Sequence, residues 1–418
     1  MTALTPIPSQ DSPRGWIVVF AAMIGVAVGL GPIPFYTIGM FAPELSKAFG
    51  WSFASLMGSL AVQSAVVMVM SPLAGWTVDR FGARRVAMIS LTLFGLAFMS
   101  LALSTGSLWL YYGQWVLIAI VGAGTLSATW TRVVNGWFDR NLGIALGVAS
   151  TGTGITGFLI KPFSAWLILE FGWRIALGVI GLIPIVIGLP VIALLFRERT
   201  GDNSAKGSVA EQREIDGRTE FGLTLVEALR SPRFWVMGVA FLFVAFALTA
   251  PTPNLENILR TFHFDLQTIG AITASFGLAV IAGRLLGGWL LDRMWAPAIA
   301  MIVLLIPATG SWLLAQQELT MATAFLSVLA IGIGAGFEFD LLAFLISRYF
   351  GQRNYGTIYG CFYTIIALGG GLGPVVYGYV FDLYGTYRLA LMAGSACLLL
   401  GPALFLLLGP YPKWNGED

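Results

Sequence analysis

The chain has 418 residues, of which 57% are hydrophobic and 11% charged, and its net charge at neutral pH is +2. A soluble globular protein carries about 25% charged residues, so this chain lacks the polar surface that a water-soluble domain of its size needs. Two cysteines exclude a disulfide-rich scaffold, and one histidine excludes sites built from several histidines. The low net charge indicates no nucleic-acid partner. The composition predicts a polytopic membrane protein, which we expect to be all-α. We also expect that it is not an enzyme and holds neither metal nor cofactor.

Apolar stretches long enough to cross a bilayer recur along the whole chain. A transmembrane helix needs about 20 such residues. Dividing the sequence at charged and turn-rich clusters predicts twelve transmembrane helices, over residues 16–41, 51–76, 84–104, 110–135, 142–168, 173–196, 233–257, 266–290, 296–316, 320–347, 354–381 and 387–409.

A polar stretch from Arg197 to Arg230 follows the sixth predicted span and divides the twelve spans into six and six. Within it, residues 221–229 are expected to form a short amphipathic helix along the membrane face. The predicted organisation is a cytoplasmic tail, a six-helix bundle, a cytoplasmic linker, a second six-helix bundle and a second tail. These parts cover residues 1–15, 16–196, 197–231, 232–410 and 411–418, respectively.

Basic residues indicate the orientation, because loops that stay in the cytoplasm are enriched in lysine and arginine. Of the 23 lysines and arginines, sixteen fall on the side of the termini, four on the opposite side and three within spans. Both termini and the linker are therefore expected in the cytoplasm. We expect a monomer in a bacterial inner membrane.

The two halves of the sequence repeat at an offset of about 212 residues. The stretch GWTVDR at 75–80 recurs as GWLLDR at 288–293, and GAG at 122–124 recurs as GAG at 334–336. A parallel repeat of two six-helix halves is typical of secondary transporters, which bind substrate near the bilayer midplane between the halves.

The pattern Gly75-x-x-x-Asp79-Arg80-x-Gly82-x-Arg84-Arg85 resembles the loop 2–3 motif of the major facilitator superfamily, and this resemblance covers essentially the whole chain. It implies the major facilitator fold. It also implies a gating role for residues at the cytoplasmic ends of spans two and eight. There an aspartate pairs across the cytoplasmic face, and the arginines anchor at lipid headgroups. The gating candidates are Asp79, Arg80, Arg84, Arg85 and Asp292.

Three further patterns resemble the monocarboxylate porter and oxalate:formate antiporter group. They are Tyr36-x-x-Gly39-x-Phe41-x-Pro43-x-Leu45, Trp137-Phe138-Asp139-Arg140-x-x-Gly143-x-Ala145-x-Gly147 and Gly172-Trp173-Arg174. Leu142 departs from the pattern, because many relatives carry an arginine at that position. The resemblance implies transport of small organic anions.

Arg284 is the main candidate for binding a substrate carboxylate. A charge at membrane depth costs several kcal/mol unless it is paired or hydrated, so each one is a functional candidate. Arg284 lies two turns before Asp292, roughly 12 Å into the membrane core. Guanidinium binds carboxylate through two parallel hydrogen bonds. An arginine in span eight also resembles the substrate-binding arginine of the monocarboxylate porters, which often have an aspartate where this chain has Val280. The alternative is a structural arginine paired with span ten.

Glu338 and Asp340 in span ten are the candidates for proton coupling. Both lie at about the depth of Arg284, but about 200° apart around the helix, so they cannot both face a cavity squarely. The resemblance favours Glu338 as the residue that lines the cavity. Burial disfavours an ionised carboxyl group and a nearby arginine favours it, which is the competition that a proton-coupled site needs. Alternatively, both acids are structural.

Two more cations and five aromatic residues complete the candidate substrate site. Arg132 in span four either extends an anion path or reaches out to the membrane interface, and Lys161 in span five is either a second cationic contact or also reaches outward. The aromatic candidates in spans one, four and eleven either contact substrate or pack between helices. They are Tyr36, Trp130, Tyr359, Phe362 and Tyr363.

Together these residues predict a secondary transporter that moves a small organic monocarboxylate with a proton by alternating access. Carboxylate exchange without protons is the first alternative, and drug or siderophore export and ligand sensing without transport are the others. The acids of span ten favour proton symport over exchange, because an exchanger needs cations and gains nothing from buried acids. Arg284 favours anions over lipophilic drugs. The glycine runs lack a following Gly-Lys-Ser/Thr, which disfavours an ATP-driven pump.

Overall fold

The computed structural model describes residues 13–135, 137–138, 142–198, 222–291, 293–351 and 353–412. These residues fold into helices, and the β pairing among them is an isolated antiparallel bridge between Gly222 and Gly351. The all-α prediction is therefore confirmed for the part of the chain that the structure describes. The predicted tails and most of the predicted linker lie outside the described residues.

The chain divides into two compact units. The first unit comprises the described residues that fall within 13–37 and 62–198, and the second comprises those within 38–61 and 222–412. The second unit therefore includes a segment, 38–61, that lies within predicted spans one and two.

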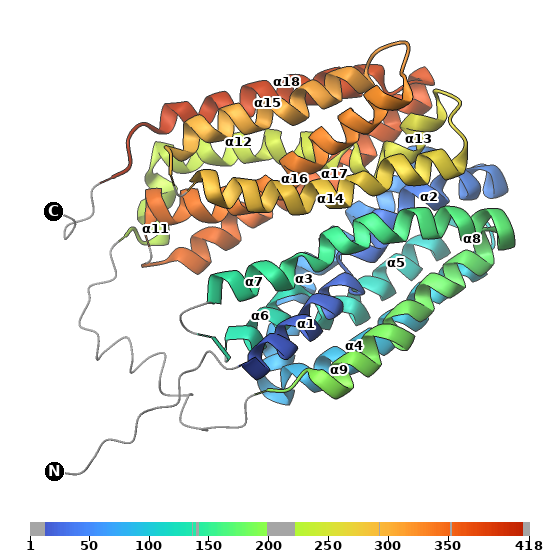
Figure 1. Ribbon diagram of the computed structural model, residues 1–418, viewed down its shortest axis with the longest axis horizontal. Coiled ribbons are helices and arrows are strands. Elements are labelled where there is room, and N and C mark those ends of the chain that lie inside the picture. Colours follow the sequence, from blue (N-terminus) through green and yellow to red (C-terminus); the bar gives the residue numbers. More distant parts are fainter. Residues whose placement is uncertain are drawn as a thin grey trace. The chain divides into compact units, whose positions relative to one another are not determined.

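Two helices contribute to both units, namely α2 (Pro32–Phe49) and α3 (Phe53–Phe81). The other helices of the first unit follow in chain order (Figure 1): α1 (Pro13–Ala27), α4 (Ala83–Met99), η1 (Ser100–Leu103), α5 (Leu108–Gly122), η2 (Ala123–Thr125), α6 (Ser127–Asn135), α7 (Leu142–Ser150), α8 (Gly152–Ile183), η3 (Pro184–Gly188) and α9 (Leu189–Leu195).

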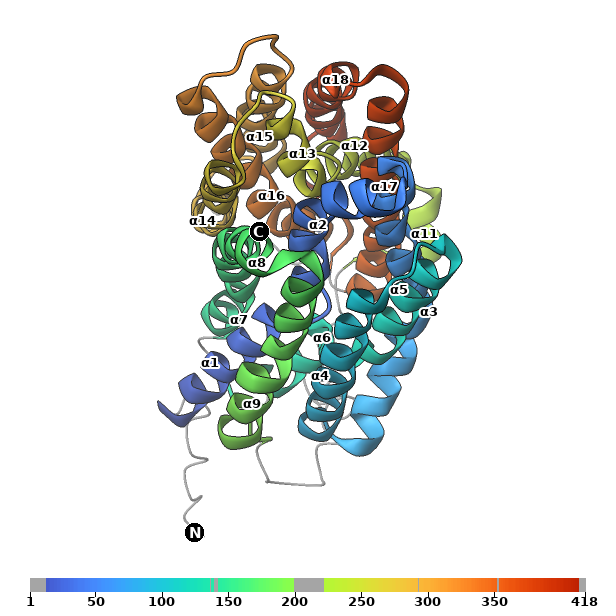
Figure 2. The same cartoon turned by 90° about the vertical axis from the view of Figure 1, so that its right-hand side faces the viewer.

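The remaining helices of the second unit are α11 (Leu225–Arg230), α12 (Pro232–Thr249), η4 (Thr252–Asn254), α13 (Leu255–Arg260), α14 (Leu266–Leu291), α15 (Ala296–Leu314), α16 (Met321–Phe350), α17 (Tyr355–Tyr384), α18 (Arg388–Phe405) and η5 (Leu406–Leu408). Within this unit, α2 and the beginning of α3 lie beside α13 and α17 (Figure 2).

The described residues contain eleven helical stretches that are long and apolar enough to cross a membrane. One of them, 144–195, has 52 residues, which corresponds to about 78 Å of helix against a hydrocarbon core of about 30 Å. Gly172 divides it, because its φ of 78° and ψ of 163° leave the helical region. Each other stretch matches one predicted span, so the eleven stretches accommodate the twelve predicted crossings.

Predicted span one is broken between α1 and α2. Pro32 begins α2 at a position where its missing N–H costs nothing. The backbone groups of Leu30 that the break leaves free are bound by side chains. Its N–H donates to Thr125 Oγ1 at 2.9 Å, and its carbonyl accepts from Gln63 Nε2 at 3.3 Å. Non-helical backbone at membrane depth is tolerated when its polar groups have such partners.

Glycines allow α14 and α16 to approach until their backbones touch, and the two helices run side by side in Figure 1. A Cβ atom added at Gly283 would collide with the carbonyl oxygen of Ile333, and one at Gly336 would collide with that of Val280. Small residues permit this close packing between membrane helices. The contact therefore fixes which face of α16 is turned toward α14.

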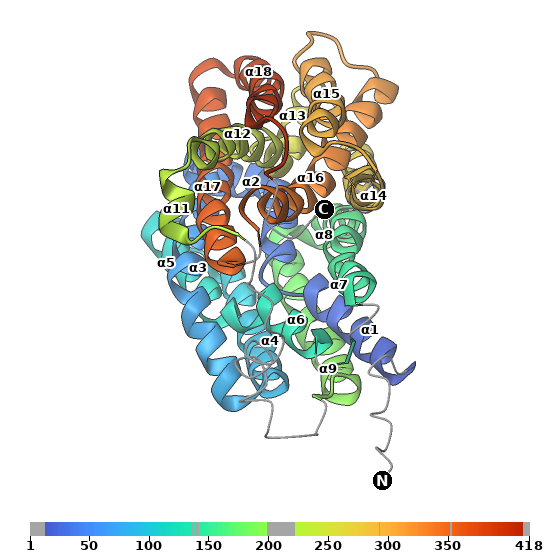
Figure 3. The ribbon, with the colours of Figure 1, turned by 90° about the vertical axis from the view of Figure 1, so that its left-hand side faces the viewer.

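A short helix, α11, follows the undescribed part of the linker and overlaps the predicted amphipathic segment; Figure 3 shows it beside α17. Thr224 and Glu227 form a capping box at its start. The backbone N–H of Thr224, bound at 2.7 Å, lowers the pKa of the Glu227 carboxyl. Ala228 is buried whereas Val226 is exposed, which gives α11 two different sides.

Candidate functional site

Arg284 lies in the second half of α14, where α14 meets α16. A Cβ atom added at Gly336 would stand 3.1 Å from the backbone nitrogen of Arg284. The backbone of Arg284 therefore lies where the two helices are closest. The side chain is half-buried, and its Nε has no hydrogen-bond partner among the described residues. A guanidinium with an unused donor is available to a carboxylate ligand.

Asp340 shares the α14-facing side of α16. It lies one turn after Gly336, the residue whose position faces the backbone of α14. Its side chain is half-buried, and Arg284 is the charged residue that acts on it. The structure therefore brings Arg284 and Asp340 to the same helix contact.

Glu338 faces a different side of α16. Gly334, one turn before it, faces Pro307 of α15 and Leu248 of α12. The Glu338 side chain is only 3% exposed, and its Oε1 has no hydrogen-bond partner in the part of the chain that the structure describes. Glu338 therefore lies within the packing of the second unit, on a side of the helix away from Asp340.

The three aromatic candidates of α17 separate into two faces. Phe362 is buried in the core of the second unit, with its ring centre 4.5 Å from that of Phe234. Tyr359 and Tyr363 stack with their ring centres 6.5 Å apart, and Tyr363 lies 6.4 Å from Phe339 of α16. The two tyrosines, but not Phe362, are therefore placed beside the segment of α16 that carries the acids.

The candidates of the first unit have different surroundings. Lys161 is fully buried, and its Nζ lies 5.9 Å from the ring centre of Tyr36, which is also buried. Trp130 is buried and donates from Nε1 to the Thr125 carbonyl at 2.8 Å, in the turn between α5 and α6. Arg132 is exposed. Lys161 and Tyr36 form a cation–π contact, whereas Trp130 satisfies a backbone group.

Arg84 of the predicted cytoplasmic motif is bonded within the first unit. Its backbone N–H donates to Glu198 Oε1 at 2.9 Å, and its guanidinium donates to the carbonyl of Ala193. These bonds connect the start of α4 to α9 and to the segment that follows α9. The expected headgroup anchor is therefore engaged in protein contacts.

The other predicted gating residues are only partly described. Arg80 lies over the Trp76 ring at 5.3 Å, and Arg85 is exposed. The side chain of Asp79 and the whole of Asp292 lie outside the described residues. The gating role of this motif stays a prediction.

Sequence reasoning missed a set of polar contacts at the opposite end of the second unit. Asp382, in the last turn of α17, accepts hydrogen bonds from the backbone N–H groups of Phe53 at 3.0 Å and Ala54 at 2.8 Å. Arg260 and Glu44 form an ion pair at 3.3 Å. One signal was available: a carboxylate near a helix C-terminus is disfavoured by the helix dipole, so Asp382 required a partner elsewhere.

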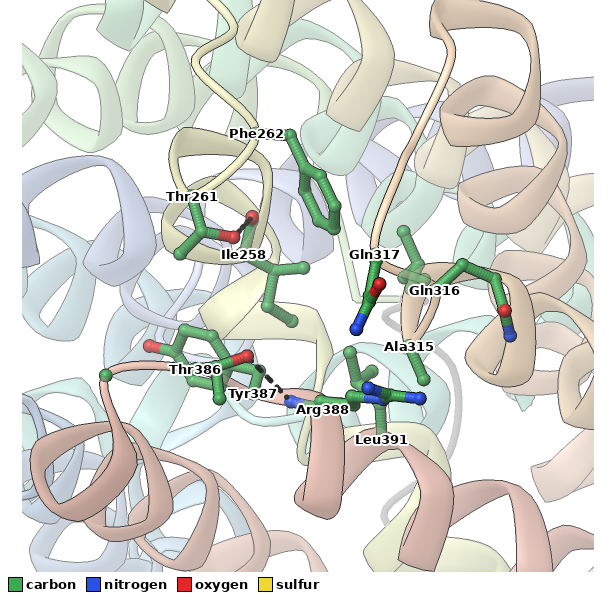
Figure 4. A pocket seen from close by; sticks show the side chains of 12 residues that line it. Ile258, Thr261, Phe262, Ala315, Gln316, Gln317, Thr386, Tyr387, Arg388 and Leu391 are labelled. Atoms are coloured by element: carbon green, nitrogen blue, oxygen red, sulfur yellow. Dashed lines mark hydrogen bonds between the residues drawn. The ribbon is translucent and has the colours of Figure 1, made fainter.

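A cavity of about 280 Å³ opens at the same end of the second unit, near the ends of α13, α15 and α18 (Figure 4). Phe262 and Ile258 contribute apolar surface, and Gln317, Thr386 and Arg388 contribute polar groups. An apolar wall beside one guanidinium can accommodate a small organic anion. The residues described as lining it include none of the predicted site residues.

The comparison with protein families decides the class. The sequence matches the family model of the Major Facilitator Superfamily over residues 15–374. The chain belongs to the major facilitator superfamily. It is therefore a membrane transporter and not an enzyme, which confirms the family, the fold and the class of activity that the sequence predicted.

The sequence also matches individual transporters along most of its length. Human monocarboxylate transporter 11 is 26% identical over 97% of this chain and 85% of its own. Monocarboxylate transporter 13 from Bos taurus is 25% identical over 95% of this chain and 90% of its own. An uncharacterized MFS-type transporter from Escherichia coli (strain K12) is 27% identical over 88% of each chain.

A solved structure has the same fold. A bacterial homolog to the human lysosomal transporter Spinster, crystallised in an inward-facing and unoccupied conformation, aligns with a TM-score of 0.71. The alignment covers 95% of this chain and 97% of that chain at 18% identity, so the likeness concerns the fold alone.

Proposed function

We propose that this transporter moves a small organic monocarboxylate together with a proton, by alternating access, across a bacterial inner membrane with both termini in the cytoplasm. The observation that carries the proposal is the placement of Arg284 and Asp340 at one helix contact. The names of the monocarboxylate transporters that resemble the chain along most of its length support the class of substrate.

Arg284 supplies the binding chemistry for a carboxylate. It presents a half-buried guanidinium whose Nε is unused among the described residues. A permanently charged, planar group with several donors binds a carboxylate through two parallel bonds, which lysine cannot do. The stacked pair Tyr359 and Tyr363 offers aromatic surface for the apolar body of an organic acid.

Asp340 connects substrate binding to a proton. Burial disfavours the carboxylate form of Asp340, and without substrate the charge of Arg284 opposes this effect by attracting the carboxylate. When a substrate carboxylate binds the guanidinium, it neutralises that charge, and Asp340 then takes up a proton more readily. Anion and proton thus bind together, and release of the anion releases the proton. The complex with both ligands has the same net charge as the empty site.

The direct test is accumulation in proteoliposomes under an imposed pH gradient, with labelled acetate, lactate and benzoate as probes. Symport predicts that an acidic outside drives uptake of at least one probe faster than the same gradient does in protein-free liposomes, where the neutral acid crosses unaided, and that removing the gradient abolishes this difference. Uptake that requires carboxylate already inside the vesicles and does not change with the pH gradient would instead identify an exchanger. Failure of every probe under both conditions would contradict the class of substrate.

A further inference from the structure

Segment 38–61 is the part of the first sequence repeat that belongs to the second unit. By sequence it belongs to the first repeat, as the end of predicted span one and the beginning of span two, but it packs with the second unit. Figures 2 and 3 both show α2 next to α17. The predicted orientation places this end of the helices on the outer face of the membrane.

The start of α3 is held by one face of α17. Asp382 accepts from the backbone N–H groups of Phe53 and Ala54, which the first turn of a helix cannot otherwise satisfy. The Phe381 ring meets Phe53 edge-on, with centres 5.0 Å apart. A Cβ at Gly378 would stand 2.8 Å from the nitrogen of Ala54, so the glycine allows the backbones to touch.

The end of α2 is held by η4 and α13. Glu44 and Arg260 form their ion pair with side chains that are 25% and 30% exposed, respectively. One turn and a half earlier, a Cβ at Gly39 would collide with the carbonyl oxygen of Pro253 and the carboxylate of Glu256. The helix therefore lies as close as a glycine permits.

We infer that Asp382 and the Arg260–Glu44 pair are the gating residues of the outer face, which hold segment 38–61 against α13 and α17 and release it when that face opens. This inference rests on the proposed alternating access. It adds an outer gate, built from different residues, to the predicted cytoplasmic gate.

The chemistry of these contacts suits a gate that opens and closes. The helix dipoles favour Asp382 at the start of α3 and disfavour it at the end of α17, so the contact stabilises the carboxylate. Because Asp382 is exposed and the ion pair is partly exposed, water replaces the lost bonds on opening. Breaking a buried ion pair is costly because it leaves a desolvated charge without a partner. Opening this gate leaves no such charge.

Distance measurements between spin labels test the gate without substrate. Cys361 and Cys397 are first replaced by serine, and labels are attached to cysteines at two exposed positions, Ala48 on α2 and Leu389 on α18. In the parent we expect a predominantly short distance. Asp382→Ala removes two charge-assisted bonds and should lower the ratio of short to long distances by about tenfold.

Two controls separate the gate from general loosening. Asp265→Ala removes a hydrogen bond at the start of α14 that does not involve segment 38–61. The Asp265 carboxylate accepts this bond from the backbone N–H of Thr268, and the bond lowers the pKa of Asp265. Gly378→Ala should shift the distances as Asp382→Ala does, whereas Gly360→Ala, on the same helix with nothing within 4 Å of its added Cβ, should leave them unchanged. Unchanged distances in both Asp382→Ala and Gly378→Ala, or an equal shift in Asp265→Ala, overturn the inference.

A charge exchange tests the ion pair. Glu44→Arg and Arg260→Glu should each increase the long-distance population, and the double variant should restore the parent distribution. If the double variant remains as open as the single ones, the pair does not hold the segment. These distances need neither substrate nor pH gradient. Failure of the gate is therefore distinguishable from failure of proton-coupled carboxylate transport in proteoliposomes.

Discussion

The same three residues, Gly-Ala-Gly, occur at corresponding places in the two repeats and adopt different structures. In the first repeat, Ala123 and Gly124 begin a 3₁₀ turn, η2, that ends α5. In the second, Gly334–Gly336 lie inside the unbroken 30-residue helix α16. The next residue differs: Thr125 donates from its hydroxyl to the Gly122 carbonyl, whereas Phe337 packs on Gly287. The glycines alone therefore do not determine whether the helix continues.

The charges inside the membrane differ between the repeats in the same way. By the offsets of the two repeated stretches, 213 and 212 residues, the positions in the first repeat that correspond to Arg284, Glu338 and Asp340 are Ser71, Leu126 and Ala128. Conversely, 212 residues after Lys161 the chain has Gly373. The unbroken α16 places an acid one turn beyond Gly336, at the contact with α14. Both repeats thus have closely packed glycines, whereas Arg284, Glu338 and Asp340 occur only in the second repeat.

The largest effect that this comparison predicts is at Arg284. Arg284→Lys keeps the charge but loses the paired hydrogen bonds, so we expect the uptake rate at low substrate concentration to fall by about 100-fold or more. Arg293→Lys is the control, because Arg293 is exposed near the end of the same helix and stacks on Trp289. Initial uptake rates in proteoliposomes give both values. An Arg284→Lys variant with the parent's rate and affinity would remove Arg284 from the substrate site.

The second prediction separates the two acids of α16. Asp340→Asn resembles the protonated acid but cannot release a proton, so accumulation under a pH gradient should fall to the level without a gradient, while exchange of substrate across the bilayer continues. Glu338 is buried on the side of α16 that faces α12 and α15, away from Arg284, so Glu338→Gln should keep most of the accumulation. Glu170→Gln, at an exposed position, is the control.

The reverse result, accumulation lost in Glu338→Gln and kept in Asp340→Asn, would assign the proton to the acid inside the bundle. It would also contradict the proposed coupling, in which substrate binding to Arg284 favours protonation of Asp340. Full accumulation in both variants would make both acids structural.

The third prediction concerns the glycines that the two repeats share. Gly336→Ala directs a Cβ at the carbonyl of Val280, which cannot turn away, so we expect a loss of about 1–3 kcal/mol in stability and slower transport. Gly124→Ala meets side-chain atoms of Val86 and Ser90, and should cost less. Gly288→Ala has nothing within 4 Å and should be neutral or stabilising. Thermal unfolding midpoints in detergent rank the three. An equal loss at Gly124 and Gly336 would contradict the proposed difference.

Hydropathy and charge were enough to predict the crossings and the family, because both depend on local composition and on a motif of adjacent residues. The features that distinguish the repeats depend on contacts far apart in sequence. The break at Leu30 is stable because Thr125 and Gln63 bind its backbone. The contact at Gly336 fixes the rotation of α16 about its own axis. That rotation determines which neighbours Glu338 and Asp340 face. A periodicity argument gives the angle between the two acids but not which one meets Arg284.

The smallest expected effect tests how the break in the first repeat is stabilised. Trp130→Phe keeps a large ring but removes the donor to the Thr125 carbonyl, leaving that buried oxygen without this bond, so we expect a loss of about 1 kcal/mol. Trp115→Phe is a closely matched control: Trp115 is equally buried in the same unit, and its Nε1 has no partner among the described residues. Removing an unsatisfied N–H costs little, so this variant should unfold at the parent's temperature or slightly above. If both variants lose the same stability, ring packing and not the hydrogen bond holds the turn, and the structural difference between the repeats must come from Thr125 and Leu30 alone.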